Sequence, residues 1–146
     1  MKQHEVSTTR LPQESFRSPW RSWALAALSV YWVAIFASTH IPPMPMAVKI
    51  VSGLDKLCHF FAYAGLALLA SIAWSQWRPA GRPLRWGNLA IVLLGLTAYG
   101  SFDEITQPLV HRTCELADWL ADVAGAAFGL AGFALSTLFV RRAAVV

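Results

Sequence analysis

Residues 123–140 read VAGAAFGLAGFALSTLFV, which is 18 consecutive residues without a charged side chain. A helix that crosses roughly 30 Å of hydrocarbon needs about 20 mostly apolar residues. A soluble amphipathic helix would carry polar residues at every third or fourth position, and this stretch does not. The segment therefore predicts a membrane-spanning helix.

Three further stretches have the same character. Charged side chains are absent from residues 22–39, 57–77 and 86–102, and only His59 interrupts the second of them. The first stretch is longer than the apolar region of a signal peptide, about 7–15 residues, and no good small-x-small cleavage site follows it. We therefore treat it as an uncleaved span and expect four spans in total.

The composition of the chain agrees with this expectation. Hydrophobic residues make up 56% of the 146 residues and charged residues 14%, against about 45–50% and about 25% in an ordinary globular domain. This balance excludes a disordered chain, a coiled coil and a disulfide-stapled mini-protein. A very hydrophobic soluble helical domain stays as the alternative. We predict an all-α, integral membrane four-helix bundle over residues 22–140, with tails at residues 1–21 and 141–146.

The positions of Lys and Arg predict the orientation of the bundle. Most of the 12 basic residues lie in the two tails and in the loop after the second span, namely Lys2, Arg10, Arg17, Arg21, Arg78, Arg82, Arg85, Arg141 and Arg142. The other two loops hold only Lys49, Lys56 and Arg112. Because cytoplasmic loops carry the excess of Lys and Arg, both termini are predicted to be cytoplasmic. The pI of about 9.5 then reflects topology and attraction to membrane lipids, and no nucleic-acid partner is expected.

The acidic residues gather at the opposite, outer side. All Asp and Glu residues except Glu5 and Glu14 fall there, together with three of the histidines, His40, His59 and His111. Topology does not require this distribution, because acidic residues contribute little to orientation. Ionisable groups within membrane spans are costly and mark functional sites, so we look for the site at this side.

Spacing predicts that these residues form a single outward-facing polar pocket. Polar residues four positions apart share one helix face, and such pairs occur near the outer end of three spans. The pairs are Asp55 with His59, Asp103 with Gln107, and Asp118 with Asp122. The pocket candidates are Asp55, Lys56, His59, Tyr63, Asp103, Glu104, Gln107, Arg112, Asp118 and Asp122. Structural roles stay open for some of them, because Asp55 and Asp118 can cap helix starts and Tyr63 can be a packing residue.

Small residues predict a helix-packing stripe. Ala121, Gly125 and Gly129 recur every four positions, which permits close helix approach. We expect this stripe to pack against the third span, with a contact between two copies of the chain as the alternative. Cys58 and Cys114 both fall at the outer side, where a disulfide is permitted but not required, so their pairing stays open.

Three segments resemble the signatures of the VanZ-like membrane proteins. Residues 55–63, DKLCHFFAY, are similar to the motif D-K-x-x-H-x-x-x-Y, and residues 98–107, AYGSFDEITQ, resemble an aromatic–small run into D-E-x-x-Q. Arg112, Asp118 and the run from Asp122 through Gly125 to Gly129 are similar to R-x(n)-D-x-x-x-N-x-x-G-x-x-x-G, with Asp122 in place of Asn. The resemblance implies a location in a bacterial cytoplasmic membrane and a cell-envelope role. The founding member of that family is associated with resistance to the glycopeptide teicoplanin, and the resemblance supplies no reaction.

Two functions are compatible with the expected pocket. In the first, it binds the headgroup of an envelope lipid or lipid-linked precursor, with Arg112, Lys56 and His59 contacting phosphate. In the second, the chain is a metal-assisted hydrolase or transferase acting on a phospholipid-type substrate, with His59 as general base. A divalent cation such as Mg²⁺ would then be held by Asp55, Asp103, Glu104 and Asp122. The metal requirement, any other cofactor, turnover and oligomeric state stay open.

Overall fold

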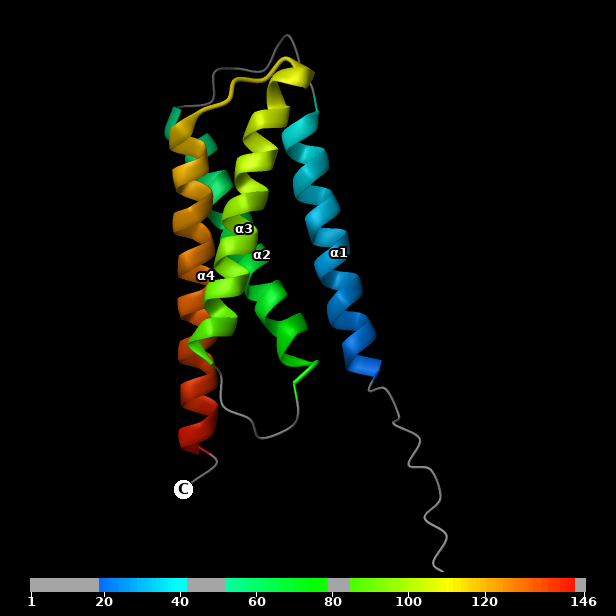
Figure 1. The fold of residues 1–146 in the computed structure, drawn as a ribbon, viewed down its shortest axis with the longest axis vertical. Coiled ribbons are helices and arrows are strands. Elements are labelled where there is room, and N and C mark those ends of the chain that lie inside the picture. The colour runs from blue at the N-terminus through cyan, green and yellow to red at the C-terminus, as the bar shows by residue number, and fades with distance from the viewer. Residues whose placement is uncertain (1–18, 42–51, 79–84, 144–146) are drawn as a thin grey trace, which may run out of the picture.

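The computed structural model describes residues 19–41, 52–78 and 85–143, and these are almost entirely helical. Four long helices lie along one axis, each reversing the direction of the one before it (Figure 1). Their bounds are α1 Pro19–His40, α2 Ser52–Ser75, α3 Trp86–Thr106 and α4 Leu116–Ala143, and a short 3₁₀ helix, η1 Gln107–Val110, follows α3. The helices α2 and α4 therefore run parallel. Most of the two predicted tails lies outside the described residues, as do Lys49 and Arg82.

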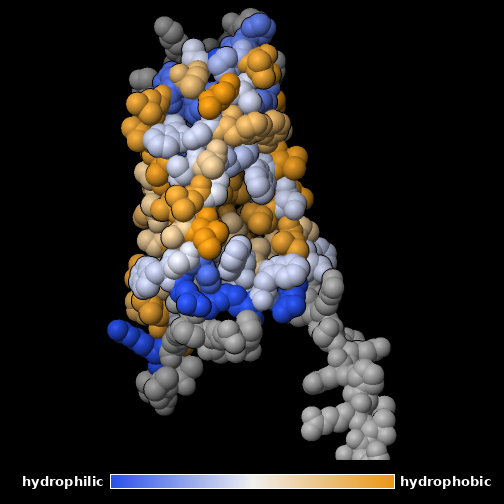
Figure 2. All heavy atoms as spheres, viewed as in Figure 1, coloured by the Kyte–Doolittle hydropathy of each residue, from blue (hydrophilic) through white to orange (hydrophobic). Residues whose placement is uncertain are grey.

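Each of the four long helices is long and apolar enough to cross a membrane. The spans are Trp20–His40, Gly53–Ser75, Trp86–Val110 and Leu116–Val140. Large apolar side chains on their outer faces are exposed, for example Val30, Leu94 and Phe128. Figure 2 shows apolar residues over the middle of the bundle and hydrophilic residues towards its two ends. Because such an exterior suits lipid better than water, the prediction of an all-α bundle of four membrane-type helices is confirmed.

A very close helix contact joins α2 to α4. A Cβ added at Gly125 or Gly129 of α4 would collide with the carbonyl oxygen of Phe60 or Ala64 of α2, respectively. Ala121, one turn before Gly125, is half-buried. Small residues allow such an approach of two backbones, which is a main source of helix association in membranes. The two glycines thus fix the register of α4 along α2.

The third helix does not take the place that the sequence analysis expected. The glycine stripe packs on α2 instead, and Gly95 of α3 has open space where its side chain would be. Gly100 of α3 approaches the Asp122 side chain, and a Cβ added at Gly100 would lie 3.3 Å from the carboxylate Oδ2. The indole Nε1 of Trp119 also donates to the carbonyl oxygen of Thr97 at 3.3 Å. Side-chain contacts, rather than a small-residue stripe, therefore join α3 to α4.

The first helix lies against α2 at the edge of the bundle. The Tyr31 hydroxyl donates to the carbonyl oxygen of Ala62 at 3.2 Å, and a Cβ at Gly65 would meet the Tyr31 ring. All four long helices contribute to one hydrophobic core, formed by Ile35, Tyr63, Leu66, Ala67, Leu89, Leu96, Ala126, Leu130, Phe133 and Ala134. Only one of these residues, Ile35, comes from α1, so most of that helix faces outward.

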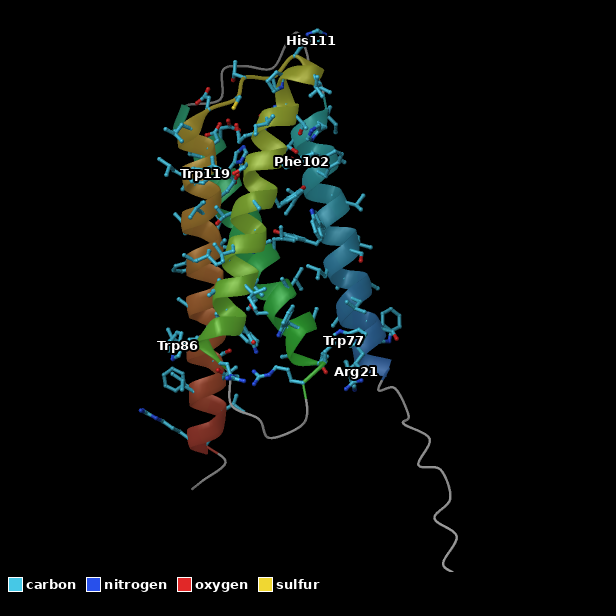
Figure 3. All side chains as sticks on the ribbon, viewed as in Figure 1. Arg21, Trp77, Trp86, Phe102, His111 and Trp119 are labelled. Carbon is cyan, nitrogen blue, oxygen red and sulfur yellow. The ribbon has the colours of Figure 1, made fainter. Side chains whose placement is uncertain are left out.

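The two ends of the bundle differ in chemistry. Arg21, Trp77 and Trp86 lie at the end where α1 and α3 begin, and Trp119 and His111 lie towards the other (Figure 3). The Arg21 guanidinium stands 5.9 Å from the centre of the Trp77 ring. Exposed tryptophan beside arginine is typical of a membrane–water interface. At the other end His111 adopts a left-handed backbone with φ of 62°, which turns the chain from η1 towards α4.

The glycine contact predicts a position-specific effect of a single methyl group. Gly129→Ala should lower the free energy of unfolding by about 2 kcal/mol or more, because backbone atoms of α2 block the added carbon and must move. Gly132→Ala is the matched control, since a Cβ added there would meet nothing within 4 Å and alanine favours the helix. Thermal unfolding of both variants in detergent measures the difference. Equal stabilities would contradict the close α2–α4 packing.

Candidate functional site

Polar side chains are buried at the end of the bundle where α1 and η1 finish and α2 and α4 begin, which we call the polar end. In Figure 3 oxygen and nitrogen atoms gather between the helices there. The buried residues of this end are Thr39, His59, Asp103, Glu104, Gln107, Asp118 and Asp122. Burying a charged group costs free energy unless it is paired or hydrogen-bonded, so the partners of each residue decide what the site can do.

An imidazole–carboxylate pair links α2 to α4. The His59 Nδ1 lies 2.9 Å from the Asp122 Oδ1, and the two side chains are 6% and 1% exposed. The second carboxylate oxygen, Asp122 Oδ2, is buried and has no hydrogen-bond partner among the described residues. An unsatisfied buried acceptor costs about 1–3 kcal/mol, so this oxygen is available to a further positive group or donor.

Asp103 has both carboxylate oxygens bonded within the protein. Its Oδ1 accepts a hydrogen bond of 2.8 Å from the Thr39 hydroxyl, and its Oδ2 accepts one of 3.3 Å from the Gln107 amide. His40 Nδ1 lies 3.6 Å from Asp103 Oδ1, and its other ring nitrogen bonds the Thr106 hydroxyl at 2.9 Å. Asp103 therefore ties the end of α1 to the end of α3.

Glu104 accepts bonds from both sides of the turn that follows α3. Its Oε2 accepts from the backbone N–H of Glu115 at 2.9 Å, and its Oε1 accepts from the Gln107 amide at 3.2 Å. Neither donor is a cation, although the residue is 4% exposed. The negative charge of Glu104 is thus hydrogen-bonded but lacks an ion-pair partner among the described residues.

Lys56 pairs with acids at the rim of the polar end. Its ammonium lies 3.0 Å from Asp118 Oδ1 and 3.1 Å from Glu115 Oε2, linking the start of α2 to the start of α4. The Asp118 side chain is 5% exposed, whereas the Glu115 side chain is 48% exposed. Lys56 therefore neutralises the buried Asp118.

A cavity of about 220 Å³ opens between α1 and α2 at the polar end. Its lining comes from α1, α2 and the α3–α4 connection, and comprises Ile35, Ser38, Thr39, Asp55, Cys58, His59, Ala62, Tyr63 and Arg112. Arg112 is held over it by a 3.2 Å bond from Nη1 to the carbonyl oxygen of Ser38. The Tyr63 hydroxyl is buried and has no hydrogen-bond partner among the described residues. Tyr63 thus lines the cavity, while its unpaired hydroxyl is buried behind the cavity surface.

The sequence candidates divide into two groups. Asp55, His59, Tyr63 and Arg112 line the cavity. The other candidates lie outside its lining and form the bonded network around it, namely Lys56, Asp103, Glu104, Gln107, Asp118 and Asp122. His59 belongs to both groups, because it lines the cavity and bonds Asp122. The structure brings all ten candidates to one end of the bundle but does not place them in one pocket.

Ser38, Thr39 and Cys58 also line the cavity, although they are not among the site residues predicted from the sequence. For Ser38 and Thr39 the sequence carries only a weak indication of a site, because a hydroxyl in the last turn of an apolar helix usually bonds its own backbone. Thr39 does so, at 3.0 Å to the carbonyl oxygen of Phe36, and also reaches Asp103. Cys58 and Cys114 are both exposed and unpaired in the structure.

Two groups of side chains have the spacing needed to hold a metal ion. Asp55, His59 and Asp118 form one, and His59, Glu104 and Asp122 form the other, with the donor atoms of each group within 4.8 Å of one another. The carboxylate set expected from the sequence included Asp103, which belongs to neither group. Its two oxygens already accept bonds from Thr39 and Gln107.

The residues of the three sequence signatures thus meet at the polar end, carried by α2, by α3 and by α4 with the loop before it. A family model described as VanZ/LLP1 matches residues 2–139 of the chain. No match was found among curated proteins or among solved structures. Since the match spans nearly the whole chain, the protein belongs to the VanZ/LLP1 family and has the helical, membrane-type fold described above.

Proposed function

We propose that the protein binds the polar headgroup of an envelope lipid, or of a lipid-linked precursor, in the cavity between α1 and α2. The observation that carries this proposal is Tyr63, which lines the cavity and whose buried hydroxyl has no hydrogen-bond partner among the described residues. A buried hydroxyl without a hydrogen bond costs free energy. A headgroup oxygen in the cavity would satisfy it once the Tyr63 side chain turns its hydroxyl towards the cavity.

The charges around the cavity suit a headgroup that carries both phosphate and hydroxyl or amine groups. Arg112 is the cation of the lining and can contact phosphate with several N–H donors. Asp55 is the carboxylate of the lining and is exposed at the rim, where it can accept bonds from hydroxyls or an amine. Lys56, expected from the sequence to contact phosphate, is engaged with two carboxylates instead.

The size and setting of the cavity favour a headgroup over a whole lipid. Its 220 Å³ lies below the roughly 300–1,000 Å³ typical of sites for drug-sized ligands. Exposed apolar side chains on both helices beside it, such as Phe36 and Phe61, offer a surface for acyl or prenyl chains. The ligand would then keep its tail in the membrane while its headgroup enters the bundle.

The proposal places the cavity at the outer face of a bacterial cytoplasmic membrane. Arg21, Arg78, Arg85 and Arg142 lie at the end away from the cavity, where the positive-inside rule would put the cytoplasm. Headgroups of the outer leaflet would enter the cavity directly from the plane of the membrane.

Filling the cavity should abolish headgroup binding. Ser38→Phe places a large side chain in the lining, whereas Ala37→Phe places the same side chain at the neighbouring exposed position outside it. Native mass spectrometry of each protein with its co-purified lipids should show one defined envelope lipid on the wild type and on Ala37→Phe, and none on Ser38→Phe. The same bulk phospholipids on all three proteins would refute the proposal.

Removing the Tyr63 hydroxyl should have opposite effects on the empty and the loaded protein. Tyr63→Phe should raise the free energy of unfolding of delipidated protein by about 1 kcal/mol, because it deletes an unsatisfied buried group. The same change should weaken headgroup binding, measured by lipid titration in native mass spectrometry. A destabilised empty protein with unchanged lipid affinity would show that the hydroxyl serves the fold and not a ligand.

The orientation can be checked by labelling single thiols with a membrane-impermeant maleimide. In a Cys58→Ala chain, the exposed Cys114 should react in intact bacterial cells, because it lies at the polar end. In a chain that also carries Cys114→Ala, a new thiol from Ala143→Cys at the end of α4 should react only after the cells are permeabilised. The reverse pattern would place the cavity at the cytoplasmic face.

A further inference from the structure

We propose that His59, Glu104 and Asp122 form a binding site for a divalent transition-metal ion of the Zn²⁺ type. Each of α2, α3 and α4 supplies one of these residues, so the site joins three helices. Their side-chain donors lie within 4.8 Å of one another, and the residues are 6%, 4% and 1% exposed. This site shares His59 with the lining of the headgroup cavity, but neither proposal requires the other.

The donor types fit Zn²⁺ better than Mg²⁺. Imidazole nitrogen and carboxylate oxygen are common zinc ligands, whereas Mg²⁺ prefers oxygen donors and keeps several waters. Zinc holds such donors at about 2.0–2.2 Å, which sets them about 3.4 Å apart in a tetrahedral site. The donors lie within 4.8 Å of one another, so a bound Zn²⁺ would have to draw them closer by side-chain movements of about 1 Å.

The second carboxylate oxygen of Asp122 independently points to a missing positive group. This oxygen is buried and has no hydrogen-bond partner in the described part of the chain. Within those residues neither Asp122 nor Glu104 pairs with Lys or Arg, and the nearby ammonium of Lys56 is held by Asp118 and Glu115. Two buried carboxylates beside one imidazole leave negative charge that a bound cation would balance.

The alternative group of donors suits a metal less well. Asp55 is exposed, and the Asp118 oxygen nearest to Lys56 lies 3.0 Å from its ammonium, which already occupies the place of a cation. Asp103 is excluded because its carboxylate belongs to neither group of donors with metal-binding spacing. Within the trio, Asp122 Oδ2 has no hydrogen-bond partner among the described residues, and each Glu104 oxygen accepts one hydrogen bond and keeps a second lone pair for a metal.

The site would place a metal beside the headgroup cavity, because His59 also lines that cavity. Three protein ligands leave a further coordination position, as in catalytic zinc sites. A metal bound at this site would lie where a metal-assisted hydrolase or transferase needs it to act on a headgroup in the cavity. Metal binding by the trio can be measured without any knowledge of such a reaction.

Metal content is measured on tag-free protein purified in detergent, stripped with a chelator and reloaded with Zn²⁺, Mn²⁺ or Mg²⁺. Elemental analysis should give one Zn²⁺ for each wild-type chain, with weaker binding of Mn²⁺ and Mg²⁺ in competition with a fluorescent chelator. Glu104→Gln should lower the Zn²⁺ affinity by more than about 100-fold, because loss of an outer-shell partner alone costs about 10–100-fold. It retains an oxygen that can accept the bond from the Glu115 backbone.

Glu115→Gln is the matched control, because it makes the same change of charge at the same end on an exposed side chain. It should keep full zinc binding, and Zn²⁺ should raise the melting temperature of this variant and the wild type but not of Glu104→Gln. Ser38→Phe should lose the headgroup and keep the metal, which separates the two proposals. Wild-type protein without stoichiometric zinc, or equal affinities in the two glutamate variants, would overturn the inference.

Discussion

The backbone contact between α2 and α4 at Gly125 and Gly129 determines the geometry of the polar end. Lipid surrounds the bundle, so no hydrophobic driving force holds the helices together and close packing must do so. Because α2 and α4 run parallel and Gly125 meets Phe60, Asp122, one turn before Gly125, lies near His59, the residue next to Phe60. That register brings His59 within 2.9 Å of Asp122. A shift of either helix by one residue would rotate this pair apart and leave two buried polar groups unsatisfied.

The first helix is attached to this rigid pair in a different way. It contributes one residue to the buried core and makes polar contacts near the cavity, from Tyr31 to Ala62, from Thr39 to Asp103 and from Arg112 to Ser38. Each of these contacts involves at least one residue that lines the cavity between α1 and α2. Since hydrogen bonds in an apolar surrounding are strong and directional, they hold α1 at a defined distance from α2 without filling the space between them. The cavity therefore lies beside the points at which the polar end and the middle of α1 are joined to the bundle.

The sequence predicts the four helices and the shared end of the polar residues, but not their partners. Uninterrupted apolar stretches identify a span by length alone, and a spacing of four residues places Asp55 with His59 and Asp118 with Asp122 on common faces. The helix that meets Gly125 and Gly129 is not encoded in that pattern, since α2 and α3 both carry small residues, and the structure selects α2. The division of the expected pocket into a cavity and a bonded network likewise depends on which donors reach Asp103. One of these donors, Thr39, is an uncharged residue at the end of an apolar stretch and is not among the predicted site residues.

His59 is the one candidate that belongs both to the cavity and to the network behind it. Its ring bonds Asp122 through Nδ1 while the residue lines the cavity, so a change at His59 alters the cavity, the α2–α4 link and the proposed metal site together. Loss of function in a His59 variant would therefore not distinguish among these roles. Ser38 touches only the cavity and Glu104 only the network, and they lie on different helices. Variants of Ser38 and Glu104 therefore probe the proposed headgroup binding and the buried acidic network separately, at residues outside the motif of residues 55–63.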